Sequence, residues 1–420
     1  MEGKMKLISL TKEEYQIYTE QNCNPDFLQS VYAANKMLHD GWIVEYYKAV
    51  ENEQIVAVFM IGYVHLLRFF YYAYIPRGFF IDYEDQQALK KVTAEIKKML
   101  KKKKVIYLEI DPKIPLYQHD KNGDLVPNGF NNEHIIENIK QAGFDHYPLK
   151  QGYDVSKQCR WISLIDLRGK TKEEVFADFS TRTRNDIRTA QKYGVKVRAL
   201  KEDELSILNY MEQEAGQRHD FETVSMDTFK TMHESYKGHI QTLYAYLDLD
   251  VYEQSLETEK EPLEKEISEL HVFLEKNPNS KKKQNRLKVA MEYYESLQKK
   301  SEEITTLREK YDKEVPLAGS MFVKFGREVV YLYSGMDYQF RTFRGAYAIQ
   351  WAMIQQAIDE GYSYYNMLGI SGFFKKGEDG YGVFDFKRGF NACVVEYIGN
   401  FTLPVCNLLY KIGMRKQNKE

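Results

Sequence analysis

The sequence predicts an α+β protein made of two similar modules and one long helical hairpin. Strand-like and helix-like stretches alternate through most of the 420 residues, which is typical of layered α/β or α+β folds. One charged segment without glycine, about residues 250–314, interrupts the second module. We therefore expect a first module over 1–150, a second over 151–248 and 315–400, a hairpin over 249–314 and a C-terminal tail over 401–420.

The first module is expected to contain four strands and two helices. The strand candidates are rich in β-branched and aromatic side chains, and they cover 42–50, 54–64, 69–75 and 105–110. Residues 86–100 and 133–142 have helical periodicity, and Gly143 stands where a helix C-cap is expected.

The second module has the same kind of alternation on both sides of the hairpin. Strands are expected at 160–167, 195–200, 239–247, 315–325, 327–335 and 364–368, and helices at 172–193, 202–218, 226–237 and 345–360. The pair QIVAVFMIGYV and FFYYAYIPRG loosely resembles the later pair VPLAGSMFVKF and EVVYLYSGMD. This similarity indicates two copies of one module.

The charged segment predicts two antiparallel helices in a coiled coil. Apolar residues recur at steps of three and four over 263–274 and again over 287–311, with Asn-Pro-Asn at 277–279 between them. Heptad spacing on both sides of a turn specifies a helical hairpin. Basic residues crowd its tip, including Lys281, Lys282 and Lys283. They are expected either to contact nucleic-acid phosphates or to remain solvated.

Composition and motifs exclude several functions. The net charge of −2 means that any affinity for nucleic acid must come from local patches. Four cysteines without metal-ligand spacing argue against a zinc site or a disulfide framework and suit a reducing cytosol. No signal peptide, apolar run of about 18 residues or nucleotide-binding fingerprint is found. We expect a cytoplasmic protein with no metal, no cofactor and no DNA partner.

Two cationic stretches are candidates for a site. Residues 381–391, YGVFDFKRGFN, place two adjacent cations among aromatic side chains, and burying a charge is costly unless it is paired or used. The stretch fits a strand, a helix with Gly389 as C′ cap, or a solvated turn. Upstream, a helix would align three cations that suit phosphate recognition or a plain surface helix: Arg184, Arg188 and Lys192.

An ordered set of motifs resembles the FemABX peptidyltransferases, and most of all the FemA-type members. The stretches are QSVYAANKMLHDGW (29–42), PRGFFIDYED (76–85), YLEIDP (107–112), TRTRNDIRTAQKYGVKVR (181–198), GAYAIQWAMIQQAIDEGYSYYNMLGISG (345–372) and FKRGFNACVVEYIGNF (386–401). They span nearly the whole chain in the order of the family, and the hairpin lies where FemA-type proteins insert theirs.

The resemblance implies two GNAT-like subdomains forming a cleft, with an antiparallel coiled-coil arm. It implies transfer of an amino acid from aminoacyl-tRNA to the stem peptide of a lipid-linked peptidoglycan precursor. The catalytic pair would be Phe386 and Lys387, and the substrate-binding residues Lys36 and Tyr333, with Tyr331 beside the latter in the Tyr-x-Tyr strand.

One departure from the family pattern concerns the segment after GQRHDF (216–221). Relatives often carry Arg and Tyr there, whereas this chain has Val224, Thr228 and Phe229. We expect Arg218 to take over part of the acceptor-binding role.

The implied reaction is aminolysis of an ester, which requires stabilisation of the oxyanion and of the departing alkoxide. A lysine in an aromatic pocket is a suitable donor, so Lys387 is assigned to charge stabilisation or proton delivery. Burial would lower its pKa, and a nearby carboxylate such as Asp385 would oppose that shift. Asp111 is a candidate general base, or else simply ends a strand before Pro112.

Two alternatives stay open for the function and two for the tail. A CoA-dependent acyltransferase or a non-catalytic tRNA-binding adaptor would share parts of this sequence pattern. The tail, FTLPVCNLLYKIGMRK, either rests on the inner membrane leaflet or docks on the first module. The amino acid transferred and the oligomeric state are not specified by the sequence.

Overall fold

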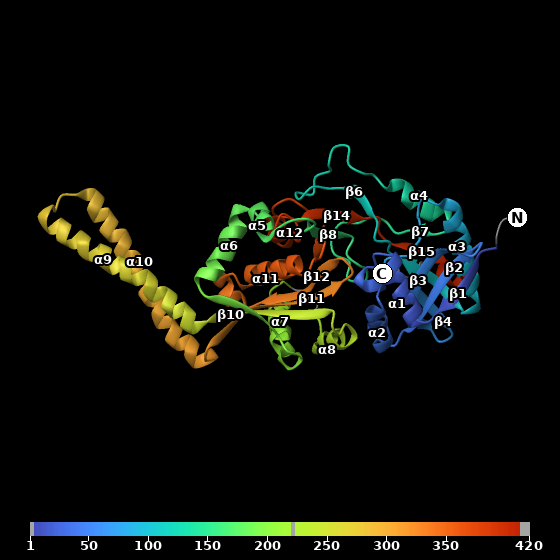
Figure 1. The fold of residues 1–420 in the computed structure, drawn as a ribbon, viewed down its shortest axis with the longest axis horizontal. Coiled ribbons are helices and arrows are strands. Elements are labelled where there is room, and N and C mark those ends of the chain that lie inside the picture. The colour runs from blue at the N-terminus through green and yellow to red at the C-terminus, as the bar shows by residue number, and fades with distance from the viewer. Residues whose placement is uncertain (1–3, 220–222, 412–420) are drawn as a thin grey trace.

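The computed structural model, which describes residues 4–219 and 223–411, contains two mixed sheets and a long projecting arm (Figure 1). The predicted α+β class is confirmed. The first sheet has the order β1-β2-β3-β4-β5-β15-β7 and the second the order β6-β14-β8-β13-β12-β11-β10-β9. The first consists of β1 (Lys6–Leu10), β2 (Ile43–Glu51), β3 (Gln54–Leu67), β4 (Phe70–Ile75), β5 (Val105–Ile110), β15 (Phe401–Pro404) and β7 (Asp145–His146). The second consists of β6 (Pro115–Gln118), β14 (Cys393–Tyr397), β8 (Trp161–Asp166), β13 (Tyr364–Gly369), β12 (Glu328–Met336), β11 (Glu314–Phe325), β10 (Ile240–Asp248) and β9 (Val195–Ala199).

Helices cover the faces of both sheets. Those of the first module are α1 (Lys12–Asn22), the short 3-10 helix η1 (Phe27–Gln29), α2 (Val31–His39), α3 (Gln86–Lys102) and α4 (Glu133–Gln141). Those of the second are α5 (Lys172–Asp178), α6 (Thr181–Lys192), η2 (Glu202–Glu204), α7 (Leu205–His219), α8 (Met226–Ser235), η3 (Tyr338–Phe343), α11 (Gly345–Asp359) and α12 (Tyr381–Gly389).

Both modules contain the same strand–helix unit. In the first, antiparallel β3 and β4 are followed by α3 and by β5, which runs parallel to β4. In the second, antiparallel β11 and β12 are followed by α11 and by β13, which runs parallel to β12. A parallel neighbour requires such a helical crossover. The two similar sequence pairs therefore occupy equivalent places in the two sheets.

The modules exchange one strand in each direction. β6 lies at the edge of the second sheet, next to β14. β15 lies inside the first sheet, where it pairs with β5 and with β7. The sheets thus do not follow chain order: β6, from before residue 150, belongs to the second sheet, and β15, from after residue 400, belongs to the first. Residues 401–404 of the expected tail dock on the first module, and residues 412–420 lie outside the described residues.

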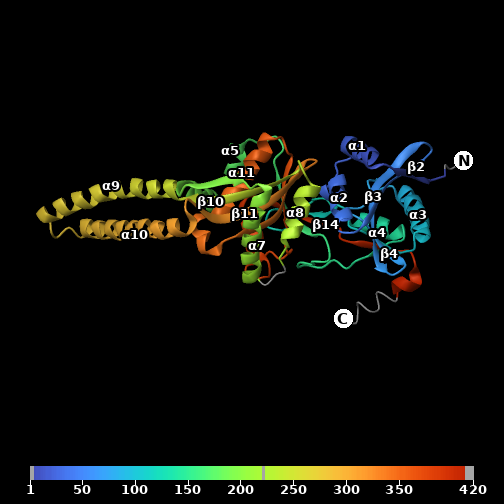
Figure 2. The same cartoon turned by 90° about the horizontal axis from the view of Figure 1, so that it is seen from below.

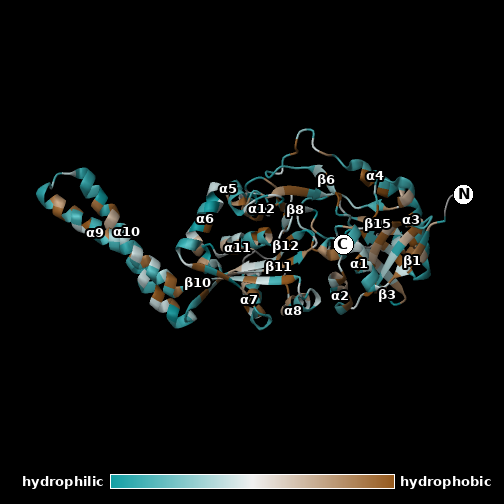
Figure 3. Ribbon diagram, in the orientation of Figure 1, coloured by the Kyte–Doolittle hydropathy of each residue, from teal (hydrophilic) through white to brown (hydrophobic). Residues whose placement is uncertain are grey.

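The predicted hairpin is formed by α9 (Leu249–Lys276) and α10 (Lys281–Tyr311), which project from the second sheet (Figures 1 and 2). Five of the buried residues form its seam: Leu256, Leu270, Ala290, Leu297 and Ile304. Most of the arm is otherwise hydrophilic (Figure 3). α9 bows along its length in Figure 2, and it contains Pro262, which cannot donate to the helical ladder.

The single helix expected over 172–193 is wrong, because the chain breaks between α5 and α6. Phe179 leaves the helix in an extended conformation and inserts into the core, where it meets Trp351 and Phe390. Ser180 then caps α6 by accepting a hydrogen bond from the Thr183 N–H. Burial of one aromatic ring therefore outweighs the continuous helical pattern.

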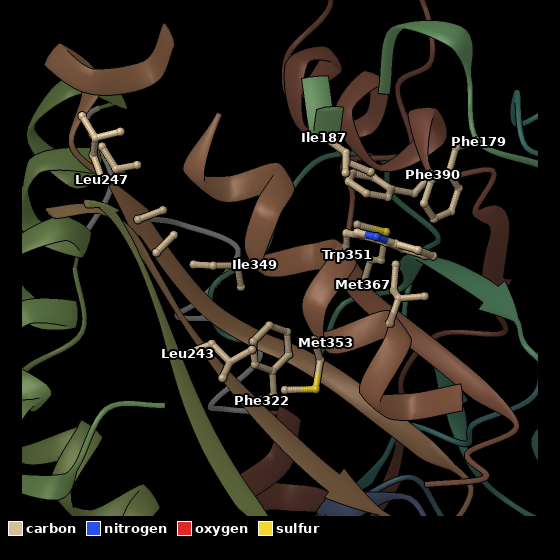
Figure 4. Packing of buried hydrophobic residues seen from close by; sticks show 14 of the residues in the cluster. Phe179, Ile187, Leu243, Leu247, Phe322, Ile349, Trp351, Met353, Met367 and Phe390 are labelled. Atoms are coloured by element: carbon tan, nitrogen blue, oxygen red, sulfur yellow. The ribbon is translucent and has the colours of Figure 1, made fainter. Parts of the chain in front are cut away.

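Two hydrophobic cores belong to single modules, and a third joins them. Figure 4 shows the core of the second module, with Phe322, Trp351 and Met353 among its buried residues. The joint core instead combines residues of both modules, such as Tyr46 and Met60 from the first with Tyr244 and Met321 from the second. The two modules thus share apolar surface.

Gly335→Ala is expected to destabilise the fold by about 1–3 kcal/mol, because small-to-large changes in packed sites cost that much. A Cβ at Gly335 would lie 2.3 Å from the backbone carbon of Met211 and 2.4 Å from the Glu212 nitrogen. Urea unfolding monitored by circular dichroism measures the change. Gly382→Ala is the control, since its Cβ meets nothing within 4 Å. Equal stability of the two variants would contradict the close packing.

Candidate active site

The stretch 381–391 is helical, so the strand interpretation is wrong. α12 begins after Gly380, which has φ 71°, and ends at Gly389. Gly389 was expected to be the C′ cap in the left-handed conformation. The residue that adopts this conformation is Asn391, with φ 59°. Gly389 instead permits close packing on α6, since a Cβ there would lie 2.4 Å from the Thr183 Oγ1.

Lys387 is buried on the inner face of α12, with 5% of its surface exposed. Its Nζ donates a hydrogen bond of 2.6 Å to the carbonyl oxygen of Gly369. Burial lowers the pKa of Lys387 to about 8, and Cys159 opposes that shift. Within the described residues, no carboxylate lies within ion-pairing distance of this ammonium. Lys387 is therefore a cation that is buried without a counter-charge and titrates near neutral pH.

The carboxylate expected to support Lys387 points elsewhere. Asp385 lies on another face of α12 and pairs with Arg388 at 2.5 Å and with Arg182 at 3.8 Å. The expectation that Asp385 opposes the pKa shift is wrong, because side chains two residues apart on a helix face different directions.

A local irregularity in β13 positions the acceptor of the Lys387 hydrogen bond. The ladder with β8 is interrupted between Asn366 and Gly369. Leu368 has φ 60°, which is uncommon for a residue with a side chain. Its N–H donates to the Asn366 Oδ1 at 2.9 Å. Strained backbone of this kind is retained where surrounding structure enforces it, often at functional sites.

Phe386, unlike Lys387, lines a cleft of about 530 Å³ between α12, α6 and α11. Its ring contacts Tyr347 and Phe390 at centroid distances of 5.0 and 5.3 Å. The cleft is also lined by Arg182, Arg388 and the N-terminal turn of α6. The two residues of the expected catalytic pair therefore have different surroundings: Phe386 lines the cleft, and Lys387 does not.

Lys36 and Tyr333 lie on the same side of the module junction. Lys36 pairs with Asp40 at 2.5 Å, and its side chain is 21% exposed. Burial raises the pKa of Tyr333, as do the charges of Glu212 and Asp40. Asp40 is therefore near both residues, and the ring of Phe229 packs on Tyr333 at 5.6 Å.

Glu212 is a residue of this region that the sequence did not single out. It is buried, with 4% of its surface exposed, and both of its carboxylate oxygens accept from the single Val224 N–H at 3.1 Å. Burial raises its pKa. Nothing in the sequence separates it from the other acidic residues of its helix, because its burial depends on the packing of α7 against β12.

Tyr331 is separated from Tyr333 by a β-bulge. The register between β11 and β12 shifts so that Met321 opposes Tyr333 and the next residue, Phe322, opposes Tyr331. Tyr331 consequently packs with the second module's core and stacks on Phe322 at 5.5 Å, whereas Tyr333 joins the core shared by the modules. Residues i and i+2 share a face only in a regular strand.

Asp111 belongs to a buried ion network at the junction. Its Oδ1 accepts from the Tyr74 hydroxyl and the Arg77 N–H, and its Oδ2 lies 3.2 Å from the Arg77 guanidinium. Burial raises the pKa of Asp111 to about 6, against the opposing influence of Arg77. Both carboxylate oxygens are therefore bonded to protein groups. This favours a structural role for Asp111 over that of a general base, which needs an oxygen free to accept a proton from the substrate.

The cationic stripe of α6 is largely used by the protein itself. Arg184 donates to the carbonyl oxygens of Ala177 and Phe179 at the end of α5. Arg188 lies over the ring of Phe176, and Lys192 pairs with Glu259 of the arm at 2.9 Å. At the arm tip, three lysines are exposed in the first turn of α10: Lys281, Lys282 and Lys283. Arg218 lies in α7, but its side chain is outside the described residues.

Comparisons with known proteins agree on one family. The model of the FemAB family matches residues 10–414. Aminoacyltransferase FemA of Staphylococcus aureus (strain NCTC 8325 / PS 47) is 30% identical over 407 residues, which is 97% of each chain; the same protein of strain bovine RF122 / ET3-1 matches equally. The crystal structure of FemX superposes with a TM-score of 0.76 at 22% identity, over 97% of this chain and 99% of that one.

The two α+β modules and the coiled-coil arm form the two-module architecture that the sequence predicts, and the crystal structure of FemX has the same fold. The chain belongs to the FemAB family, and it is an aminoacyltransferase of that family. None of the helices in the described ranges is long and apolar enough to span a bilayer.

Replacing Lys387 by Met is expected to change how stability depends on pH. The folded pKa of about 8 lies below the ordinary value of 10.5, so the unfolded chain binds more protons between these values. Wild-type stability should therefore rise relative to Lys387→Met as the pH increases from about 8 to 10.5, by about 3 kcal/mol. Chemical unfolding across this range measures it.

The control is Lys376→Met, which removes an exposed charge from the loop before α12. If the stabilities of Lys387→Met and the wild type changed in parallel between about pH 8 and 10.5, the lowered pKa of Lys387 would be ruled out.

Proposed function

We propose that this enzyme transfers an amino acid of the Gly, Ser or Ala class from aminoacyl-tRNA to a peptidoglycan precursor. The acceptor is the stem peptide or the growing cross-bridge of a lipid-linked precursor, and the reaction takes place in the cytoplasm. Family membership supports this assignment. The observation that carries the chemistry is the buried Lys387, which has no carboxylate partner in the described part of the chain and whose pKa is lowered by burial to about 8.

The proposed reaction is aminolysis of the ester that links the amino acid to the tRNA ribose. The amine nitrogen of the acceptor attacks the carbonyl carbon, a new C–N bond forms, and the C–O bond to the ribose breaks. The amine loses a proton and the ribose oxygen gains one. No covalent enzyme intermediate is required.

Lys387 suits the departing oxygen in this scheme. A protonated amine in a site of low polarity stabilises a developing alkoxide more strongly than it would in water. A pKa near the working pH also lets the group give up its proton at modest cost. A small shift of α12 or of the Gly369 loop would free the ammonium from the Gly369 carbonyl, which holds it in this structure.

Lys36 and Tyr333 are proposed to bind the acceptor. Lys36 is only partly exposed and is held by Asp40, so an acidic group of the acceptor would compete with that carboxylate. Tyr333 presents a hydroxyl in the same region, between Glu212 and Asp40. The cleft beside Phe386, which is also lined by Arg182 and Arg388, is proposed to bind phosphates near the 3′ end of the tRNA, while the terminal ribose with its ester would lie at Lys387.

Lys387→Ala is expected to lower kcat by at least about 100-fold, which is the usual scale for removing one stabilising donor or acid. The wild-type rate should also fall as the pH rises above about 8, because the protonated form of Lys387 acts. Transfer of radiolabelled amino acid to a lipid-linked precursor measures both effects, with a panel of charged tRNAs to identify the amino acid.

Lys376→Met is again the matched control, and its kcat should equal that of the wild type. Full transfer by Lys387→Ala would exclude the proposed role of the lysine. Turnover of acetyl-CoA with no transfer from any charged tRNA would favour a CoA-dependent acyltransferase instead.

Lys36→Ala and Tyr333→Phe are expected to raise the KM for the acceptor about tenfold and to leave the KM for aminoacyl-tRNA unchanged, because a hydrogen bond to a charged group contributes about 1.5–3 kcal/mol. Initial rates with each substrate varied in turn separate the two constants. Lys12→Ala, which removes a neighbouring surface lysine bonded to Asn35, serves as the control. A rise in the KM for aminoacyl-tRNA alone would reassign both residues.

A further inference from the structure

The hairpin between β3 and β4 exposes an apolar tip. Leu66, Leu67 and Phe69 are 47%, 53% and 60% exposed, and Arg68 stands between them with its guanidinium over the Phe69 ring. Single exposed apolar residues are ordinary on protein surfaces, but three large ones at the end of a hairpin are not. We refer to residues 66–69 as the hairpin tip.

A basic turn lies beside the hairpin tip. The Tyr71 N–H, two residues past the tip, donates to the Lys104 carbonyl oxygen at 3.1 Å. This contact brings the end of α3 next to the start of β4. Three of the four lysines in this turn are exposed, namely Lys101, Lys102 and Lys104, whereas Lys103 pairs with Glu45 at 2.7 Å.

The C-terminal segment reaches the same end of the first sheet. The N–H groups of Val405 and Cys406 both donate to the Ile106 carbonyl oxygen, next to the basic turn. The helical turn that follows places Leu408 at 72% exposure. Figure 2 shows this red C-terminal turn beside β4 at the lower edge of the module. The acidic groups near this end include Glu45, which pairs with Lys103, and Asp145 and Glu109, which both add to the effect of burial in raising the pKa of Tyr410.

We propose that this end of the first module binds an anionic lipid surface. The hairpin tip and Leu408 would enter the interface between headgroups and acyl chains, while Arg68 and the exposed lysines contact anionic headgroups. An apolar wedge with a cationic rim is the combination that gives peripheral proteins their membrane affinity. Cations at the end of α3 also suit the helix dipole, but the dipole does not account for the apolar tip.

The location fits a lipid-linked acceptor, and in this respect the inference rests on the proposed function. α2, which carries Lys36, runs into β2, and Ile43 at the start of β2 pairs with Tyr63 of β3, four residues before Leu67. The acceptor-binding residue and the hairpin tip are thus connected through one stretch of the first sheet. A precursor anchored in the bilayer would need to leave it only by a short distance.

The test is flotation of the purified full chain with vesicles, which requires no tRNA or precursor. The wild type should bind vesicles of mixed phosphatidylcholine and phosphatidylglycerol, bind phosphatidylcholine alone weakly, and detach as salt is raised. The triple variant Leu66→Ser, Leu67→Ser, Phe69→Ser should bind at least about tenfold more weakly, because burial of large apolar side chains supplies much of the affinity.

The matched control is the double variant Leu125→Ser, Val155→Ser, which removes side chains of 61% and 99% exposure outside this surface. It should bind as the wild type does. A second test keeps the fold intact: Phe69→Trp should gain blue-shifted emission with vesicles, and brominated acyl chains should quench it.

Absence of wild-type binding to the mixed vesicles, or equal binding by the triple variant, would overturn the proposal. Self-association of the wild type that the triple variant abolishes, without vesicle binding, would assign the tip to a second copy of the chain. Transfer to a soluble acceptor without lipid should be the same in wild type and triple variant. If neither the wild type nor the triple variant transferred an amino acid to the soluble acceptor, the result would count against the proposed reaction and not against lipid binding.

Discussion

A buried ion network holds the two modules in one arrangement. Lys113, just after β5, lies 2.9 Å from Asp26 of the first module and 2.7 Å from Glu328 of the second. Burial alone would raise the pKa of Asp26, yet Lys113 and Arg77 hold it below its ordinary value. Removing one member of such a set leaves an unpaired buried charge, which costs several kcal/mol. The network therefore opposes any rearrangement of the modules that would separate Lys113 from Asp26 or Glu328.

Lys387 is in the opposite electrostatic situation. The cations of the junction have carboxylate partners, whereas Lys387 has a single carbonyl, provided by an irregular strand end. Burying Lys387 without a carboxylate partner costs free energy. The protein can tolerate this cost because the two modules share a core and α12 packs closely against α6. Lys387 is thus a buried cation without a carboxylate partner among the described residues, whereas the buried cations of the junction are paired.

The features that the sequence predicted are the long and periodic ones. The arm was predictable because heptad spacing on both sides of Asn-Pro-Asn leaves few alternatives. α12 was ambiguous because nine residues satisfy helix and strand patterns alike. The division of α5 from α6 depended on where Phe179 packs. The opposite faces of Tyr331 and Tyr333 depended on an extra residue of β12, Leu332, which is evident only once β12 is paired with β11. The separation of Asp385 from Lys387 depended on the stretch being a helix and not a strand, and the burial of Glu212 depended on the packing of α7 against β12.

The exchange of β6 and β15 has a consequence for synthesis of the protein. β5 and β7 flank β15 in the first sheet, so that sheet stays open until residues 401–404 have left the ribosome. Almost the entire chain, including the arm, must be translated before the N-terminal module can close. Pairing of strands about 290 residues apart is slow because the loop must first be ordered. The nascent chain therefore presents two unpaired strand edges for most of its translation, and such edges are templates for aggregation that chaperones must cover.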